Sequence, residues 1–121
     1  YAIEKGAALG MNCWIYDEGG WPSGSACGNV TKAHPEFSVE NSKYPDLLNK
    51  NATDYFINIT HEKYATAMKK TLGEAVTAVF TDEPKAPAGA FNKELAEKYE
   101  SLYGESILPY LPYGYLTIRN I

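Results

Sequence analysis

The sequence predicts an α/β fold in which parallel strands alternate with helices, as in part of a (β/α)8 TIM barrel. Two short apolar runs, at residues 11–16 and 75–81, are typical of buried strands. Stretches with helical spacing of apolar residues cover 1–9, 51–72 and 92–103. A closed barrel takes about 200 residues or more. We therefore expect the 121 residues to form a fragment of such a barrel domain, with the whole range 1–121 in one unit.

The first two elements come from the first 16 residues. Ile3, Ala7 and Leu9 have the spacing of a short helix, and Gly10 follows as a stop signal. The next run, through Tyr16, is nearly all apolar and short, which favours a buried strand. Residues 17–50 are rich in Gly, Pro, Ser and Asn and predict a long loop. Loops of that length usually carry function or small elements of their own.

The clearest helical pattern runs over residues 51–72. Asn51 is expected to cap it, with Asp54 in the capping-box position three residues on. Gly73 ends the pattern. The second strand follows at 75–81, and Pro84 cannot donate to a sheet ladder, so the strand is expected to stop before it. Asn92 is expected to start the last helix, and the tail from 105 to 121 predicts irregular structure.

A pair of adjacent acidic residues follows each predicted strand. Asp17 and Glu18 follow the first strand, and Asp82 and Glu83 follow the second. Ligands of α/β folds bind beyond the carboxyl ends of parallel strands. If the two strands are neighbours, the two pairs are expected to face a common cleft. Carboxylates placed there can act as general acid and general base, or can bind a divalent metal ion.

Aromatic residues accompany the first acidic pair. Trp14, Tyr16 and Trp21 flank it, and aromatic rings next to carboxylates suit carbohydrate, because rings stack on apolar sugar faces and acids bond to hydroxyls. Glycoside hydrolysis uses a pair of carboxylates. Each feature also has a structural interpretation: the acids could cap loops or pair with lysines, and Trp14 is expected in the core rather than at a ligand.

Composition excludes several classes of protein. The net charge of −4 argues against binding to nucleic acid, which needs a basic surface. No apolar run approaches the roughly 20 residues of a membrane-spanning helix. Two cysteines are too few for a disulfide framework. His34 has no visible ligand partner and His61 is expected at the surface, so neither supports a metal site or a catalytic triad.

Three stretches resemble one enzyme family. They are WIYDEGGWPSGSACGNV (14–30), YPDLLNKNATDYFINITHEKY (44–64) and VFTDEP (79–84), and the resemblance runs over about residues 6 to 112. They are similar to the catalytic barrel of bacterial glycoside hydrolases of the α-L-rhamnosidase type, family 106, and uncharacterised relatives. The chain is far shorter than those enzymes, and its stretch between Val30 and Tyr44 is short where many relatives carry an insertion.

The resemblance implies hydrolysis of glycosidic bonds in bacterial polysaccharide degradation, with an oligo- or polysaccharide as substrate. It implies Glu83 as the acid/base carboxylate with Asp82 in support, and a sugar site lined by Asp17, Glu18, Trp21, Tyr16 and Trp14. Calcium is used at the site by some members of the family. The resemblance also implies a periplasmic or secreted protein, and a chain completed by the remaining barrel strands of its parent, without which we expect the fragment to be inactive.

Three other functions stay open from the sequence. A non-catalytic carbohydrate-binding remnant would keep the aromatic rings and lack turnover. A metal-dependent barrel lyase or aldolase would use the same acids on non-glycosidic substrates. In a domain without a site, the acids would belong to the surface.

Overall fold

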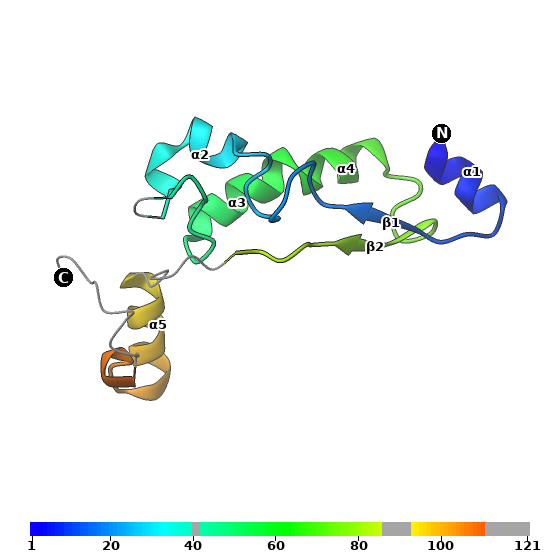
Figure 1. The fold of residues 1–121 in the computed structure, drawn as a ribbon. Coiled ribbons are helices and arrows are strands. Elements are labelled where there is room, and N and C mark those ends of the chain that lie inside the picture. Colours follow the sequence, from blue (N-terminus) through cyan, green and yellow to red (C-terminus); the bar gives the residue numbers. More distant parts are fainter. Residues whose placement is uncertain (40–41, 86–92, 111–121) are drawn as a thin grey trace.

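A computed structural model of the chain describes residues 1–39, 42–85 and 93–110. It has a mixed α/β fold with a small parallel sheet (Figure 1). The elements, in order, are α1 (Ala2–Ala8), β1 (Cys13–Tyr16), α2 (Asn29–Ala33), a 3₁₀ turn (Pro35–Phe37), α3 (Lys50–Ile59), α4 (His61–Ala67), β2 (Val76–Phe80), α5 (Lys93–Tyr103) and a second 3₁₀ turn (Leu108–Tyr110). Among the described residues, no helix is long and apolar enough to cross a bilayer.

Strands β1 and β2 pair directly and in parallel, which confirms the predicted βαβ arrangement. The register pairs Trp14 with Ala78 and Tyr16 with Phe80. Both strands are shorter than predicted, because regular pairing begins at Cys13 and Val76 and ends at Tyr16 and Phe80. The described residues thus contain one two-stranded sheet.

Burial differs from residue to residue in the sheet, and Val79, the partner of Ile15 across the two strands, is 47% exposed. Ile15 and Val76 are 7% and 2% exposed, whereas Trp14 is 68% exposed. Side chains alternate between faces along a strand, so Trp14 and Tyr16 lie on the face opposite to Ile15. The expectation that Trp14 belongs to the core is therefore wrong for the described residues. Helices α3 and α4 run alongside the strands (Figure 1).

The predicted 51–72 helix is two helices that meet at Thr60. The Thr60 hydroxyl donates to the carbonyl of Phe56 at 2.6 Å, and the Thr60 backbone leaves ideal helical geometry at φ −119° and ψ −79°. A hydroxyl that bonds back to the preceding turn bends helices, which accounts for the break. The prediction of one continuous helix, ending at Gly73, was wrong.

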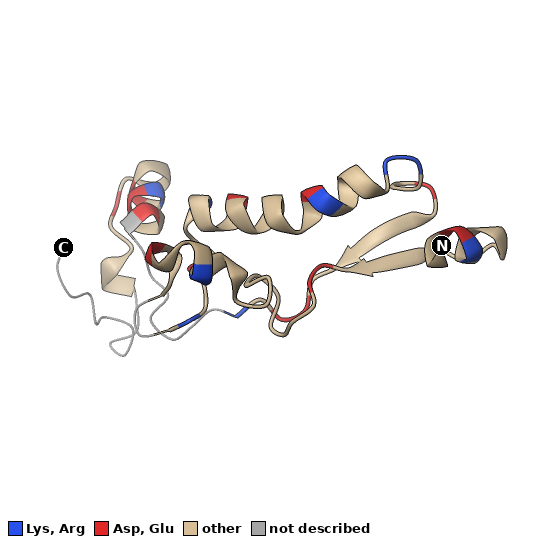
Figure 2. Ribbon diagram, turned by 90° about the horizontal axis from the view of Figure 1, so that it is seen from above, with Lys and Arg blue, Asp and Glu red and all other residues tan. Residues whose placement is uncertain are grey.

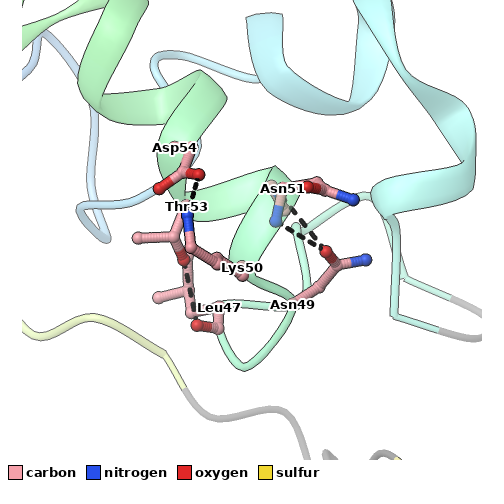
Figure 3. A network of polar contacts seen from close by, with 7 residues as sticks. Leu47, Asn49, Lys50, Asn51, Thr53 and Asp54 are labelled. Carbon is pink, nitrogen blue, oxygen red and sulfur yellow. Dashed lines mark hydrogen bonds and ion pairs between the residues drawn. The ribbon is translucent and has the colours of Figure 1, made fainter. Parts of the chain in front are cut away.

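The cap of α3 is Asn49, two residues before the predicted Asn51. The Asn49 Oδ1 accepts hydrogen bonds from the backbone N–H groups of Asn51 (2.9 Å) and Ala52 (3.4 Å) (Figure 3). Asp54 pairs with Lys50 on the helix surface and makes no capping box. Asn49 satisfies N–H groups that the first helical turn leaves without a partner, so the helix begins one residue earlier than predicted.

The long loop contains small elements of its own, as predicted. Its α2 contributes Val30, which is fully buried and clusters with Ala26 and Phe56 of α3. His34 stacks on Phe37 with ring centroids 4.7 Å apart and meets Tyr55 edge-on at 4.6 Å. This apolar cluster ties the loop to α3 and thereby fixes the segment that follows β1.

Two further expectations concern His61 and the chain ends. His61 is half-buried and edge-on to Phe56, and its Nε2 is buried without a hydrogen-bond partner among the described residues, so the surface expectation was wrong. Gly10 follows α1 with φ +71°, the left-handed geometry of a helix stop. The predicted start of the last helix, Asn92, and the tail residues 111–121 lie outside the described residues.

Candidate functional site

The two acidic pairs lie at the same edge of the sheet. The backbone N–H of Asp17 donates to the carbonyl of Phe80 at 3.1 Å, and the N–H of Ser23 donates to the carbonyl of Asp82 at 2.9 Å. Figure 2 shows the acidic segments just beyond the ends of both strands. The prediction that both pairs follow neighbouring parallel strands is confirmed.

Asp17 is enclosed at this edge. Its side chain is 1% exposed, and its Oδ1 accepts a hydrogen bond of 2.6 Å from the hydroxyl of Ser23, which is fully buried. Its Oδ2 is buried without a protein partner among the described residues. A buried carboxylate needs donors to offset its lost hydration, so the Ser23 bond is important for keeping Asp17 in place.

Glu18 is the centre of a hydrogen-bonded loop. Its Oε2 accepts from the N–H groups of Gly24 (2.8 Å) and Ala26 (2.7 Å), and its Oε1 accepts from the N–H of Cys27 (3.0 Å) and the Ser25 hydroxyl (3.3 Å). Left-handed backbone at several loop positions turns successive N–H groups toward one carboxylate, an arrangement that suits an anion. Among the described residues, the Glu18 carboxylate accepts hydrogen bonds from the loop. Contact between Glu18 and a sugar stays a prediction.

Asp82 joins the two strand ends through its side chain. Its Oδ2 accepts a hydrogen bond of 2.7 Å from the hydroxyl of Tyr16. This bond, with smaller contributions from burial and the negative charge of nearby acids, raises the pKa of Tyr16 to about 12. The Tyr16 phenol therefore stays protonated at neutral pH and can keep donating to Asp82.

Glu83 differs from the other three acids because its side chain is exposed. Its backbone has φ +43°, in the left-handed region. A non-glycine residue there costs about 1–2 kcal/mol, and such residues cluster at functional sites. Among the described residues, none donates a hydrogen bond to the Glu83 carboxylate, so it is free to interact with a ligand.

The predicted aromatic residues are all accessible. Trp14 and Trp21 are each 68% exposed, and Tyr16 is 40% exposed. Tyr16 lies against Phe80 with ring centroids 5.8 Å apart, and Phe80 is itself 45% exposed. The sheet face that carries Trp14 and Tyr16 thus presents rings at the same end as Asp82.

An open cavity of about 350 Å³ lies between the loop after β1 and helices α3 and α4. Asp17 and Glu18 line it together with residues of the loop, α3 and α4, including Asn29, Ile59, Thr60, Lys63 and Tyr64. Asp82, Glu83 and the two tryptophans do not line it. The structure therefore brings the acids to one sheet edge, where Asp17 and Glu18 are buried and Glu83 is exposed, and a cleft common to both pairs stays a prediction.

The described residues do not fit a calcium ion. Nowhere in residues 1–39, 42–85 and 93–110 do three His, Cys, Asp or Glu side chains gather where a metal ion could bind. The oxygens of Glu18 already accept protein donors, whereas calcium takes 6–8 oxygen ligands.

The sequence interpretation missed two residues of this site, Ser23 and Tyr44. Ser23 joins Asp17 to Asp82, and the Tyr44 hydroxyl donates to the carbonyl of Ser23. Both lie inside stretches that carry the family resemblance, WPSG and YPD. Ser23 lies between Pro22 and Gly24, and Tyr44 precedes Pro45, so turn residues next to each were the available signal, but that signal does not name the hydrogen-bond partners.

No protein-family model, no curated protein and no solved structure matches this chain.

Proposed function

We propose that this chain supplies part of the catalytic centre of a glycoside hydrolase of the α-L-rhamnosidase type, with Glu83 as the acid/base carboxylate. The observation that carries the proposal is the exposed Glu83 side chain on left-handed backbone at the carboxyl end of β2. Ligand sites of parallel α/β sheets lie at that end. Asp17 and Glu18 hold the adjoining loop and line the cavity beside it.

The neighbours of Glu83 support a carbohydrate substrate. Trp14, Tyr16 and Trp21 expose ring surface near the strand ends, and aromatic faces suit the apolar faces of sugars. The Tyr16 hydroxyl donates a hydrogen bond to the Asp82 carboxylate and so fixes its position. Asp82 remains partly exposed. Rings and carboxylates at one end of a sheet are the elements that glycoside hydrolysis needs.

The proposed fold of the active protein is a (β/α)8 barrel to which β1 and β2 contribute neighbouring strands. The exposed rings on one face of the sheet support this, because in a barrel that face meets side chains of other strands. In that setting, Glu83 would protonate the leaving glycosidic oxygen while a second carboxylate activates water or attacks the sugar. The second carboxylate would come from another strand of the intact protein.

The test uses the intact protein and methyl α-L-rhamnopyranoside as the probe, because its alkoxide leaving group needs the proton that a general acid supplies, whereas 4-nitrophenolate leaves without it. Replacing Glu83→Gln should lower kcat by about 10²–10⁴-fold while the far-UV circular dichroism stays unchanged, because general acid–base catalysis contributes that much. Glu74→Gln is the matched control, since Glu74 is also exposed and lies at the other end of β2. Full activity in Glu83→Gln protein would overturn the assignment.

A second candidate, sugar binding without turnover, is favoured by the 68% exposure of Trp14 and Trp21. Under that function the intact protein would bind oligosaccharide, and Glu83→Gln would leave the dissociation constant unchanged. Absence of hydrolysis in the intact wild-type protein, with retained binding, would decide for it.

A further inference from the structure

We propose that Ser23 and Tyr44 are positioning residues that hold the segment 82–85 and thereby aim the Glu83 carboxylate. This inference rests on the proposed role of Glu83. Neither residue touches the Glu83 side chain through a hydrogen bond. They act on the backbone on both sides of it.

Ser23 holds the chain before Glu83 through two hydrogen bonds. The N–H of Asp82 donates to the Ser23 hydroxyl oxygen at 2.9 Å, and the N–H of Ser23 donates to the Asp82 carbonyl at 2.9 Å. The Ser23 hydroxyl proton is directed to Asp17 Oδ1 at 2.6 Å, so its lone pairs face Asp82. Ser23 is fully buried, and water therefore does not replace these bonds.

Tyr44 holds the chain after Glu83. Its hydroxyl accepts a hydrogen bond of 3.0 Å from the N–H of Lys85 and donates to the carbonyl of Ser23. Burial raises the pKa of Tyr44, which keeps this hydroxyl protonated. A Cβ at Gly24 would lie 2.7 Å from the Tyr44 hydroxyl, so the loop leaves room for this contact only because residue 24 is glycine.

Together the two residues fix Asp82 and Lys85, and Glu83 lies between them on left-handed backbone. With only Pro84 between Glu83 and Lys85, few backbone torsions remain free, because the proline ring locks φ. The backbone that carries the Glu83 side chain is therefore held in place. The Glu83 carboxylate oxygens themselves accept no hydrogen bond from the described residues. Accurate placement of a catalytic group has large effects on rate.

The experiment removes each hydroxyl in the intact protein with Ser23→Ala and Tyr44→Phe. The controls are Ser101→Ala and Tyr103→Phe, which remove exposed hydroxyls on α5 that make no hydrogen bond to residues 82–85. Two readouts are needed. Amide hydrogen exchange reports the backbone of Asp82 and Lys85, and kinetics with methyl α-L-rhamnopyranoside, whose leaving oxygen needs protonation, report the reaction.

We expect exchange at Asp82 to accelerate about tenfold or more in Ser23→Ala, and at Lys85 in Tyr44→Phe, with α3 amides unchanged. We expect kcat to fall about 10- to 100-fold with KM within about threefold. In a Glu83→Gln background the same changes should have little further effect on kcat, because residues that act as a unit are not additive. A purely structural role would lower activity equally in both backgrounds.

Several outcomes would overturn the inference. Unchanged exchange at Asp82 and Lys85 would show that the segment does not depend on the two hydroxyls. A second outcome is that Ser23→Ala and Tyr44→Phe exchange faster but keep the kcat of the wild type, while Glu83→Gln is inactive. In that case the hydroxyls hold the segment but do not determine the position of the Glu83 carboxylate. If Ser23→Ala fails to fold, Tyr44→Phe decides alone, since it removes one oxygen atom. Full activity in Glu83→Gln would instead contradict the proposed function. The exchange rates of Asp82 and Lys85 would still show whether Ser23 and Tyr44 hold the backbone of residues 82–85.

Discussion

The hydroxyl of Tyr16 donates to Oδ2 of Asp82 at 2.7 Å and so connects the last residue of β1 to the segment beyond β2. The two residues are 66 positions apart in the chain. The bond therefore links two residues that only the fold brings together, and an ionised Asp82 carboxylate is its acceptor. A charged acceptor makes the bond stronger than one between neutral groups.

Titration of Tyr16 should reveal this bond. The Tyr16 pKa of about 12 lies above the ordinary tyrosine value of about 10. Because the folded-state pKa is raised, the stabilisation is complete below about pH 10 and is lost as pH rises from about 10 to about 12. In Asp82→Asn protein, the Tyr16 pKa should fall back toward the ordinary value.

The measurement is ¹³C NMR of tyrosine ring carbons against pH, with Tyr16→Phe to assign the resonance. Tyr103→Phe is a suitable control, because that exposed ring on α5 has no bond to Asp82. Titration of Tyr16 near pH 10 in both wild-type and Asp82→Asn proteins would contradict the bond.

Replacing Glu18 should destabilise the protein through the loop it organises. In Glu18→Gln, an amide NH₂ takes the place of an oxygen that accepts protein donors, so at least one N–H of the loop would face another donor. Leaving buried donors without acceptors should lower the free energy of unfolding by about 2–4 kcal/mol.

Urea unfolding of the purified protein measures this loss. Glu74→Gln serves as the control, because it changes an exposed glutamate and should alter stability by less than about 0.5 kcal/mol. Equal stability of the Glu18 and Glu74 variants would mean that the hydrogen bonds around Glu18 do not hold the loop in solution.

Local signals in the sequence predicted the strands and the acids at their ends, but not the division of α3 from α4. Apolar runs and the residues that end them are short-range features, and both strands formed where they were expected. The break at Thr60 depends on one hydroxyl bonding back to Phe56, which periodicity does not report. Helix boundaries also depend on which of several asparagines serves as the cap.

The site was less predictable than the fold for a similar reason. Acid pairs at strand ends follow from sequence order, whereas the burial of Asp17 and Glu18 depends on how the loop folds back through Ser23 and the residues after it. In this loop, backbone N–H groups bond to the Glu18 side chain. Every residue except proline has such an N–H group, so the sequence does not indicate which of them will bond to Glu18. The Glu83 side chain stays exposed, whereas Asp17 and Glu18 are buried, and the order of the residues in the sequence does not distinguish the two cases.

The two asparagines at the start of α3 give a direct test of the cap. Asn49→Ala should lower the free energy of unfolding by about 1 kcal/mol, because Asn49 accepts bonds from two N–H groups of the first turn. Asn51→Ala should be neutral or slightly stabilising, since alanine has the higher helix propensity. Thermal or urea unfolding measures the stability of both variants. A larger loss of stability in Asn51→Ala than in Asn49→Ala would show that Asn51 is the cap, as the sequence predicted.

Sugar recognition by the exposed rings is the prediction that depends most on the proposed function. Trp21→Ala should weaken binding of 4-nitrophenyl α-L-rhamnopyranoside to intact Glu83→Gln protein by about 3- to 10-fold, corresponding to about 0.6–1.4 kcal/mol of stacking. Stability should change little, because Trp21 is 68% exposed and little of the ring is removed from water on folding.

Isothermal titration calorimetry measures the dissociation constant, and Tyr103→Ala on α5 is the control, at 66% exposure and away from the strand ends. If Trp21→Ala binds the probe as tightly as the control does, the Trp21 ring is an ordinary surface residue. If it loses stability more than affinity, the ring serves the fold of the loop.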